Sequence, residues 1–151
     1  MHPEQLAMAK AGTVTWGAVV EETLRWLSPV VNLPFRYTSE PVELAGTAIA
    51  AGEALLMCHA AAGRDPEQHG PDVHLFDATR TQRPHLAFGQ GPHFCLGASL
   101  ARLEGTLALE RLFTRFPGLT LREANPQPLS SLISGGFTTL HATTANGPAT
   151  A

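Results

Sequence analysis

A glycine-flanked loop around one cysteine, residues 85–97 with the sequence HLAFGQGPHFCLG, stands directly before the clearest helical pattern of the chain. Glycines on both sides of Cys95 let the backbone turn sharply and approach another group closely. A helix that begins at Leu96 would direct unpaired N–H groups and a partial positive charge toward the sulfur. These conditions favour the thiolate over the thiol, so the loop predicts a functional sulfur.

A lone thiolate in such a loop has three chemical uses. It can act as a nucleophile with His93 as its base. It can be the axial ligand of heme iron, for which one sulfur suffices. It can bind zinc, although the paired C-x-x-C spacing is missing; the histidines available for zinc are His93, His85, His74 and His69. The structural alternative is a small buried apolar residue, which we predict for Cys58 within LLMCHAAA.

Composition excludes several classes of protein. The chain has 151 residues, of which 44% are hydrophobic and 15% charged. This length and composition predict one packed domain or a piece of a larger one. A formal net charge of -3 gives no sign of the basic surface that binds nucleic acid. No apolar run approaches the roughly 20 residues that span a bilayer, so we expect no membrane association. The N-terminus lacks a secretory signal and two cysteines make no disulfide framework, so we expect a cytoplasmic protein.

Hydrophobic periodicity predicts helices first and short strands next. Residues 16–27 carry apolar side chains at helical spacing, and Ser28-Pro29 ends the pattern. A second short helix is expected within residues 1–15, ending near Gly12. Between residues 32 and 56 apolar and polar residues alternate around glycines, which predicts a small antiparallel sheet.

The second half of the chain predicts one long helix between irregular segments. Residues 55–62 predict a short helix closed at Gly63, and residues 63–84 predict an irregular loop, whose length is typical of a functional segment. A long helix follows the cysteine and ends at residues 116–118, with a leucine-rich face. Its apolar positions are Leu96, Leu100, Leu103, Leu107 and Phe113. The segment 130–144 predicts a hairpin around Gly135-Gly136, and the chain is expected to fray from about residue 146.

Three motifs together resemble those of one family. The segment FGQGPHFCLGA, residues 88–98, is similar to the heme-binding signature of cytochrome P-450, the heme-thiolate monooxygenases, in its soluble bacterial branch. Residues 22–25, ETLR, match the E-x-x-R helix of that family. Residues 63–66, GRDP, match its Asn-Arg-Asp-Pro stretch, with Gly63 in place of the usual asparagine. The resemblance implies a mainly α fold with small antiparallel β-sheets (α+β), as the C-terminal heme-binding part of the cytochrome P-450 fold, incomplete.

The resemblance implies a cofactor and the residues that would bind it. The cofactor is heme b (iron protoporphyrin IX), and the Cys95 thiolate would be its axial iron ligand. Arg36 and His93 would pair with the heme propionates. The remaining cofactor-binding positions are Phe88 against the macrocycle, Gly89, Leu96 and Gly97, with backbone N–H groups at Leu96 and Gly97 donating to the sulfur. No residue of the chain is assigned a catalytic role.

A supporting network is also implied. Glu22 and Arg25 lie three residues apart on a helix and can pair with each other. The resemblance implies that this pair is buried and joined by an arginine from the segment before the cysteine loop. Arg80 is the first choice for that third member, with Arg64 and Arg83 as alternatives.

The resemblance also extends to substrate and partner segments. Residues 30–33 and 133–136 correspond to substrate-contacting segments of the family. An acidic electron donor, a ferredoxin or a flavoprotein, would dock on a basic patch after the cysteine loop. The members of this patch would be Arg102, Arg111 and Arg115.

The expected domain organisation and function follow. Residues 1–145 are expected to form the C-terminal portion of a cytochrome P-450 domain, and residues 146–151 a disordered tail. The parent protein would insert one oxygen atom from O2 into a small organic substrate, using electrons from its redox partner. The alternative is a non-catalytic truncated remnant that at most binds heme or acts as an interaction fragment. Because the distal heme-covering helix of the family is not in the sequence, we expect a wide exposed apolar patch.

Overall fold

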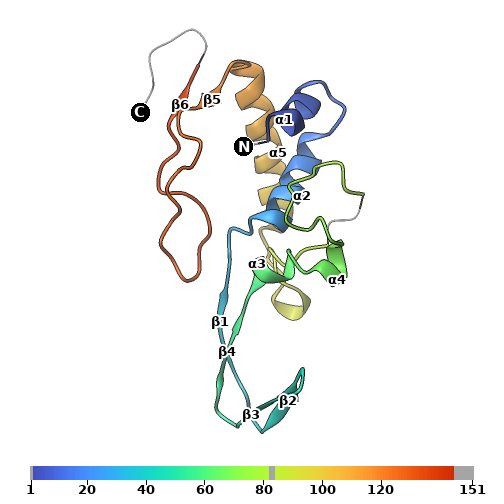
Figure 1. Cartoon of the computed structure of the whole chain (residues 1–151), viewed down its shortest axis with the longest axis vertical. Helices are drawn as coiled ribbons and strands as arrows, with labels where there is room; N and C mark the ends of the chain where they lie inside the picture. The colour runs from blue at the N-terminus through green and yellow to red at the C-terminus, as the bar shows by residue number, and fades with distance from the viewer. Residues whose placement is uncertain (1, 82–83, 145–151) are drawn as a thin grey trace.

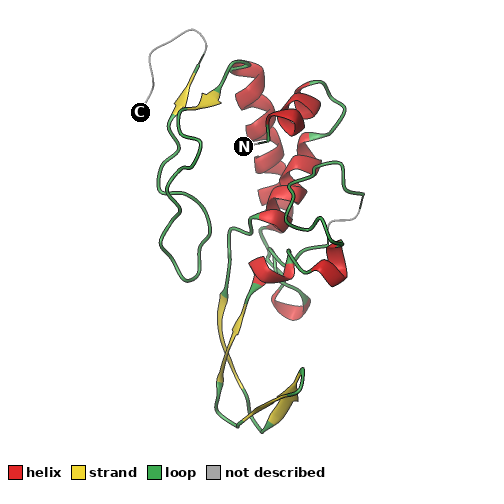
Figure 2. Ribbon diagram, in the orientation of Figure 1, coloured by secondary structure: helices red, strands yellow, loops and turns green. Residues whose placement is uncertain are grey.

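Five helices and three separate strand pairs are found in the described residues, 2–81 and 84–144, of the structure, a computed structural model. The helices are α1 (Pro3–Lys10), α2 (Trp16–Trp26), α3 (His59–Ala62), α4 (Pro66–His69) and α5 (Ala98–Arg115). The strands are β1 (Leu33–Tyr37), β2 (Val42–Leu44), β3 (Thr47–Ile49), β4 (Ala54–Met57), β5 (Thr120–Leu121) and β6 (Ala142–Thr143). Figures 1 and 2 show the helices gathered at one end and the β1–β4 segment extending away as an arm. The predicted α+β class is confirmed.

Helix α2 is bounded by clear local signals. Thr15 caps its N-terminus, because its hydroxyl oxygen accepts the Ala18 N–H at 3.1 Å. At the C-terminus the Leu27 N–H donates to the Thr23 carbonyl at 2.8 Å, after which Ser28-Pro29 prevents continuation. The predicted helices over residues 16–27 and within 1–15 are both confirmed.

The α2–α5 pair forms the centre of the helical part, and Figure 1 shows the two helices side by side. The helices approach closely because α5 has a glycine at the contact: a Cβ on Gly105 would lie 3.3 Å from a Val20 methyl group. At the other end of the contact the rings of Trp16 and Phe113 stack with their centroids 5.4 Å apart. Helix α5 begins at Ala98, two residues later than predicted, because residues 95–98 form a turn in which the Ala98 N–H donates to the Cys95 carbonyl.

The leucines of α5 that face away from α2 are exposed. Leu100, Leu103 and Leu107 have between 44% and 57% of their surface accessible, so this apolar stripe contributes little to the core within the described residues. The exposed apolar patch expected from the sequence is present on this face.

The strands form three antiparallel pairs, β1 with β4, β2 with β3, and β5 with β6. The predicted small sheet over residues 32–56 is therefore two separate two-stranded pairs. The predicted helix over residues 55–62 is wrong in its first half: residues 54–57 form β4, and only His59–Ala62 is helical. Pairing of Leu33 with Met57 gives the Leu-Leu-Met run cross-strand partners, which outweigh its helix propensity.

The C-terminal segment closes a longer loop than predicted. Strand β6 pairs with β5 some twenty residues earlier, so the predicted hairpin confined to residues 130–144 is wrong in its partner. Within this loop the Leu129 N–H donates to the Gly136 carbonyl at 2.9 Å. Gly135 serves a different purpose, since its N–H donates to the Pro29 carbonyl and a Cβ there would lie 2.7 Å from the Ser28 carbonyl oxygen. Long-range contact with the α2 exit, rather than a local turn, explains this glycine.

The described parts of the loop predicted over residues 63–84 are irregular, as predicted, apart from the one-turn α4. Residues 82–83 and the predicted tail at 146–151 lie outside the described residues. Within the described ranges, no helix combines the length and apolar character needed to cross a membrane.

Gly63 ends α3, although in a different way from a left-handed helix cap. Its φ is -68°, which any residue adopts, so backbone conformation does not require glycine here. The lack of space requires glycine instead, because a Cβ on Gly63 would overlap the Arg25 carbonyl oxygen. With this backbone, the asparagine usual in the GRDP-like stretch would not fit, which gives the departure a structural reason.

We predict that Gly63→Ala destabilises the chain by about 1–3 kcal/mol, because the added methyl group must push the 62–64 backbone off the end of α2. Urea unfolding monitored by circular dichroism measures the change. Gly17→Ala, on helix α2, is the matched control: its Cβ would meet only the hydroxyl oxygens of Thr15 and Thr106, each at 3.8 Å, so it should leave stability unchanged or raise it by roughly 0.5–1 kcal/mol. Equal stability of both variants would contradict the account of Gly63.

Candidate functional site

The cysteine loop folds back on itself ahead of α5. Cys95 donates its backbone N–H to the Phe88 carbonyl at 2.9 Å, and the Gly89 N–H donates to the Leu86 carbonyl at 2.8 Å. Gly89 and Gly91 have φ values of +71° and +77°, in the left-handed region that favours glycine. The glycines that flank the cysteine are therefore needed for the shape of the loop, as the sequence predicted.

The sulfur of this loop is accessible and has apolar neighbours. Cys95 is exposed. Leu96 is fully exposed at 104%, and Phe94 is 49% exposed. Gly97 stands at the cap position of α5, where a Cβ would lie 3.7 Å from the Cys95 sulfur. A single soft sulfur donor next to exposed apolar side chains, at the start of a helix, suits a flat apolar metal cofactor. His93 is exposed on the same loop.

A buried ion pair on α2 supports the segments around this loop. Glu22 and Arg25 are both 0% exposed. The Arg25 guanidinium donates to both Glu22 oxygens, at 2.8 and 2.7 Å, which is bidentate pairing. Its remaining N–H groups donate to three backbone carbonyls, those of Gly63, Val73 and Leu75, at 2.7 to 3.0 Å. The charges are therefore paired and hydrogen-bonded, which is what burial of an ion pair requires.

Arg80 is the third member of the network. Its Nε lies 3.4 Å from Glu22 Oε1, and its Nη2 donates to the Asp72 carbonyl at 2.8 Å. The Asp77 N–H also donates to Glu22, at 2.9 Å. Among the predicted alternatives, Arg64 instead donates to the Trp26 carbonyl and stacks over the Trp26 ring, and Arg83 lies outside the described residues. The first choice made from the sequence is confirmed by the geometry.

A second cluster joins α2 to the cysteine loop itself. Arg102 donates to both oxygens of Glu21, at 2.5 and 3.2 Å. His85 Nε2 lies 3.2 Å from Glu21 Oε2, and the His85 side chain is only 5% exposed. The Arg102 guanidinium carbon stands 4.7 Å from the centroid of the Phe88 ring, a cation–π contact.

Charge in this cluster changes the ionisation of Glu21. Burial alone raises the pKa of this carboxyl, but hydrogen bonds from Arg102 and His85, together with the charge of Arg102, outweigh burial and lower the pKa below its ordinary value of 4.5. The same pairing with Glu21 raises the pKa of Arg102. The carboxylate is therefore held ionised by its partners.

The zinc and nucleophile alternatives find no matching geometry. In the part of the chain that the structure describes, no three His, Cys, Asp or Glu side chains lie close enough together to hold a metal ion. His85, a candidate for zinc, is engaged with Glu21. Between His93 and Cys95 there is no side-chain hydrogen bond in the described residues. Cys58, predicted to be buried, is exposed, because it follows β4 on the projecting arm and caps the short α3.

The other predicted site residues are spread over the structure. Arg36 is exposed on β1, and within the described residues its side chain donates only to the Phe35 carbonyl, at 3.4 Å. Residues 30–33 and 133–136 come together: the Val31 N–H donates to the Ile133 carbonyl at 2.8 Å. Of the predicted basic patch, Arg102 is occupied by Glu21, while Arg111 and Arg115 are exposed.

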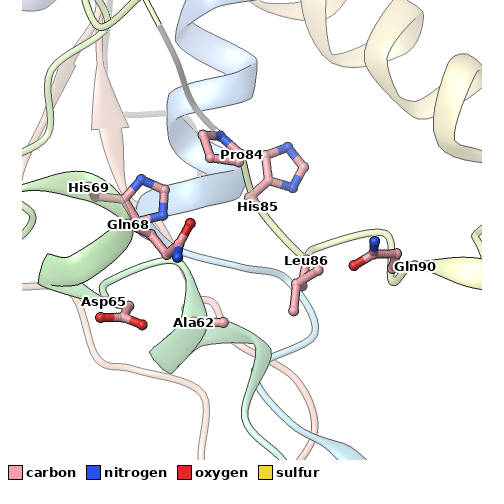
Figure 3. Close-up of a pocket in the computed structure, with 8 residues that line it drawn as sticks. All are labelled: Ala62, Asp65, Gln68, His69, Pro84, His85, Leu86 and Gln90. Carbon is pink, nitrogen blue, oxygen red and sulfur yellow. The ribbon is translucent and has the colours of Figure 1, made fainter.

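A pocket of about 340 Å³ lies beside the chain that leads into the loop, with α3 and α4 on its other side (Figure 3). Its lining residues are Ala62, Asp65, Gln68, His69, Pro84, His85, Leu86 and Gln90. Burial, with the nearby charges of Arg25 and Arg80, lowers the pKa of His69, so this side chain favours its neutral form. Cys95 does not line the pocket, which is therefore separate from the accessible sulfur.

Glu21 is the site residue that sequence reasoning missed. Its neighbour Glu22 belongs to the recognised motif, and adjacent helix positions point about 100° apart. The tandem Glu21-Glu22 was a signal for two carboxylates with two different partners, although sequence spacing alone did not identify Arg102 or His85 as those partners.

Comparison with known proteins shows the family. The cytochrome P450 family model matches residues 16–141. The chain is 48% identical over 120 residues to 6-deoxyerythronolide B hydroxylase of Saccharopolyspora erythraea, covering 80% of this chain and 29% of that protein. It is also 48% identical over 120 residues to the cytochrome P450 monooxygenase PikC of Streptomyces venezuelae, with the same coverage of 80% and 29%.

Solved structures agree with this fold. The structure of CYP154A1 from Streptomyces coelicolor superposes with a TM-score of 0.86 at 52% sequence identity, covering 93% of this chain and 36% of that one. The structure of P450BioI in complex with a fatty-acid-ligated acyl carrier protein superposes with a TM-score of 0.87 at 37% identity, covering 95% and 37%. The chain belongs to the cytochrome P450 family, whose members bind heme b. It spans about 29% of the length of the two sequence relatives named above.

We predict that Glu22→Gln lowers the free energy of unfolding by about 3–5 kcal/mol, because Arg25 would then stay buried without a counter-charge, whereas Arg80 would keep Asp72. Chemical unfolding at neutral pH measures it. Glu110→Gln, an exposed position on α5, is the control and should change stability by less than about 0.5 kcal/mol. A change as small as the control would show that the pair does not support the fold.

A pH dependence follows from Glu21. Since its pKa is lower in the folded chain than the ordinary 4.5, its ionised form stabilises the fold above that pH, and this contribution is lost as the pH falls through the folded-state pKa. We predict that Glu21→Gln flattens the fall in unfolding free energy on acidification below 4.5. Urea unfolding at a series of acidic pH values, compared with wild type, measures the slope; parallel slopes would contradict the lowered pKa.

Proposed function

We propose that residues 1–145 form the C-terminal portion of a cytochrome P450 monooxygenase domain, and that the Cys95 thiolate is the axial ligand of its heme iron. One observation carries this proposal: Cys95 is exposed on a folded-back loop at the start of α5, with its backbone held by Phe88. The thiolate form of cysteine is the one that binds metal.

The residues of the loop have distinct roles in this proposal. Phe88 lies against the face of the macrocycle on the side of the sulfur. In the heme-bound state, backbone N–H groups at Leu96 and Gly97 would donate to the sulfur, which would adjust its electron donation to iron. Gly89 keeps the left-handed turn that lets the macrocycle approach closely.

Two side chains, those of Arg36 and His93, anchor the heme in this proposal. Arg36 and His93 are exposed and without an acidic partner in the described residues, so both are available to a propionate. A guanidinium pairs especially well with a carboxylate because it donates two parallel N–H groups.

The whole protein would insert one oxygen atom from O2 into a small organic substrate. Bound heme supplies the oxygen-activating chemistry, to which thiolate donation contributes. Residues 30–33 and 133–136, joined through Val31 and Ile133, form one wall of the substrate site. That wall excludes water and orients the substrate.

An electron donor and a location complete the proposal. The donor would be a ferredoxin or a flavoprotein, with Arg111 and Arg115 as exposed cations for an acidic partner. Arg102 is omitted from this patch because Glu21 neutralises it. The protein would work in the cytoplasm and would bind neither membrane nor nucleic acid.

A second candidate is a fragment that binds heme without turnover or serves as an interaction piece. The exposed leucine stripe of α5 favours it, because Leu100, Leu103 and Leu107 need a cover that the described residues do not supply. A fragment that binds heme would share the Cys95 ligand with the first candidate but would oxidise no substrate, whereas an interaction piece would need no heme.

The test of the ligand is the carbon monoxide difference spectrum of the reduced, heme-loaded chain. We predict the red-shifted Soret band of thiolate-ligated heme, and its complete loss in Cys95→Ala. Cys58→Ala is the matched control, since Cys58 is the other exposed cysteine, and should keep the band. A band that survives Cys95→Ala, or that is absent from heme-loaded wild type, would overturn the proposal.

A further inference from the structure

Glu21 is the only link in the described residues that joins α2, α5 and the cysteine loop through one side chain. Its Oε1 receives Arg102 of α5, and its Oε2 receives both Arg102 and His85 from the start of the loop. The adjacent Glu22 points to the other network and has no contact with these partners. The tandem carboxylates therefore serve two separate parts of the structure.

The hydrogen bonds of His85 fix its tautomer. The Ala87 N–H donates to His85 Nδ1 at 3.2 Å, so this nitrogen carries no proton. The proton is then on Nε2, which donates to Glu21 at 3.2 Å. Glu21 thus orients an imidazole that in turn holds the backbone at Ala87, one residue before Phe88.

Both arms of the cluster converge on Phe88. Arg102 covers one face of the Phe88 ring at 4.7 Å, and the ring centroids of His85 and Phe88 are 6.0 Å apart. The carbonyl of Phe88 then accepts the Cys95 N–H at 2.9 Å. A continuous set of contacts runs from Glu21 to the backbone of Cys95.

We propose that Glu21 is a positioning residue for Cys95: its carboxylate holds Arg102 and His85 so that they fix Phe88, whose carbonyl receives the Cys95 N–H. The consequence for heme rests on the proposed function, in which Cys95 is the iron ligand. The positioning itself is a property of the chain without heme.

Glutamine cannot replace the carboxylate here. Glu21 accepts three N–H groups with two oxygens, whereas glutamine offers one oxygen and an NH2 group that would face a donor. Either Arg102 or His85 must then move away, and Phe88 loses one of its two supports.

The direct test is amide hydrogen exchange of the heme-free chain, read at Cys95. We expect Glu21→Gln to speed exchange of the Cys95 amide at least about tenfold relative to amides in the middle of α2 and α5. Glu104→Gln removes the same charge from an exposed position on α5 and should leave Cys95 exchange unchanged. An unchanged Cys95 rate in Glu21→Gln, or an equal acceleration across α2 and α5, would overturn the proposal.

Two further variants keep the test decisive if Glu21→Gln folds poorly. Phe88→Leu leaves the Glu21 ion pairs in place but removes the ring, and should also speed Cys95 exchange. Arg102→Lys keeps a cation for Glu21 but loses the flat guanidinium over Phe88, and should give an intermediate rate. Wild-type rates at Cys95 in both variants would contradict the proposal.

A spectroscopic measurement separates this proposal from the ligand assignment. In heme-loaded protein, Glu21→Gln should lower the fraction of thiolate-type carbon monoxide spectrum at unchanged heme content, while Glu104→Gln should not. If Cys95→Ala abolishes that spectrum and Glu21→Gln leaves it at the wild-type fraction, positioning is wrong and the ligand stands. If Cys95→Ala changes nothing, the ligand assignment fails, while accelerated exchange in Glu21→Gln would still support positioning.

Discussion

The buried ion pair between Glu22 and Arg25 is the interaction on which the rest of the structure depends. Two charges without solvent are stable only when every donor and acceptor is satisfied. Arg25 meets this condition by donating to the carbonyls of Gly63, Val73 and Leu75. Glu22 meets it by accepting from Arg25 and from the Asp77 N–H, and Arg80 adds a second cation at 3.4 Å. A long segment with little secondary structure of its own is thereby fixed on one helix face. The Glu22–Arg25 pair therefore holds this segment against α2, a role that a hydrophobic core has in most domains.

Helix α2 organises the site through a second carboxylate as well. While Glu22 and Arg25 together fix the segment from residue 63 to 77, Glu21 connects the same helix to α5 and to the cysteine loop. The loop is therefore held at both ends, by Phe88 before Cys95 and by α5 after it. Cys95 stays exposed although its backbone is constrained, as a ligand that must receive a large planar cofactor requires.

The sequence predicted correctly those features that depend only on residues close together in the chain. The cap of α2, the left-handed glycines beside Cys95 and the exposed leucine face follow from residue types and their spacing. Motif resemblance supplied the family and the choice of Arg80, which periodicity alone would not have given. Features that depend on residues distant in the sequence were missed. The strand at 54–57 forms by pairing with β1, and β6 forms by pairing with β5. Glu21 was missed for the same reason, since its partners lie 64 and 81 residues away.

The central claim is that this framework presents one sulfur to heme iron. X-ray absorption at the iron edge of the heme-loaded chain tests it directly, because scattering distinguishes a sulfur neighbour from nitrogen or oxygen. We predict one sulfur in the coordination shell beside the porphyrin nitrogens. A shell of nitrogen and oxygen only would contradict it.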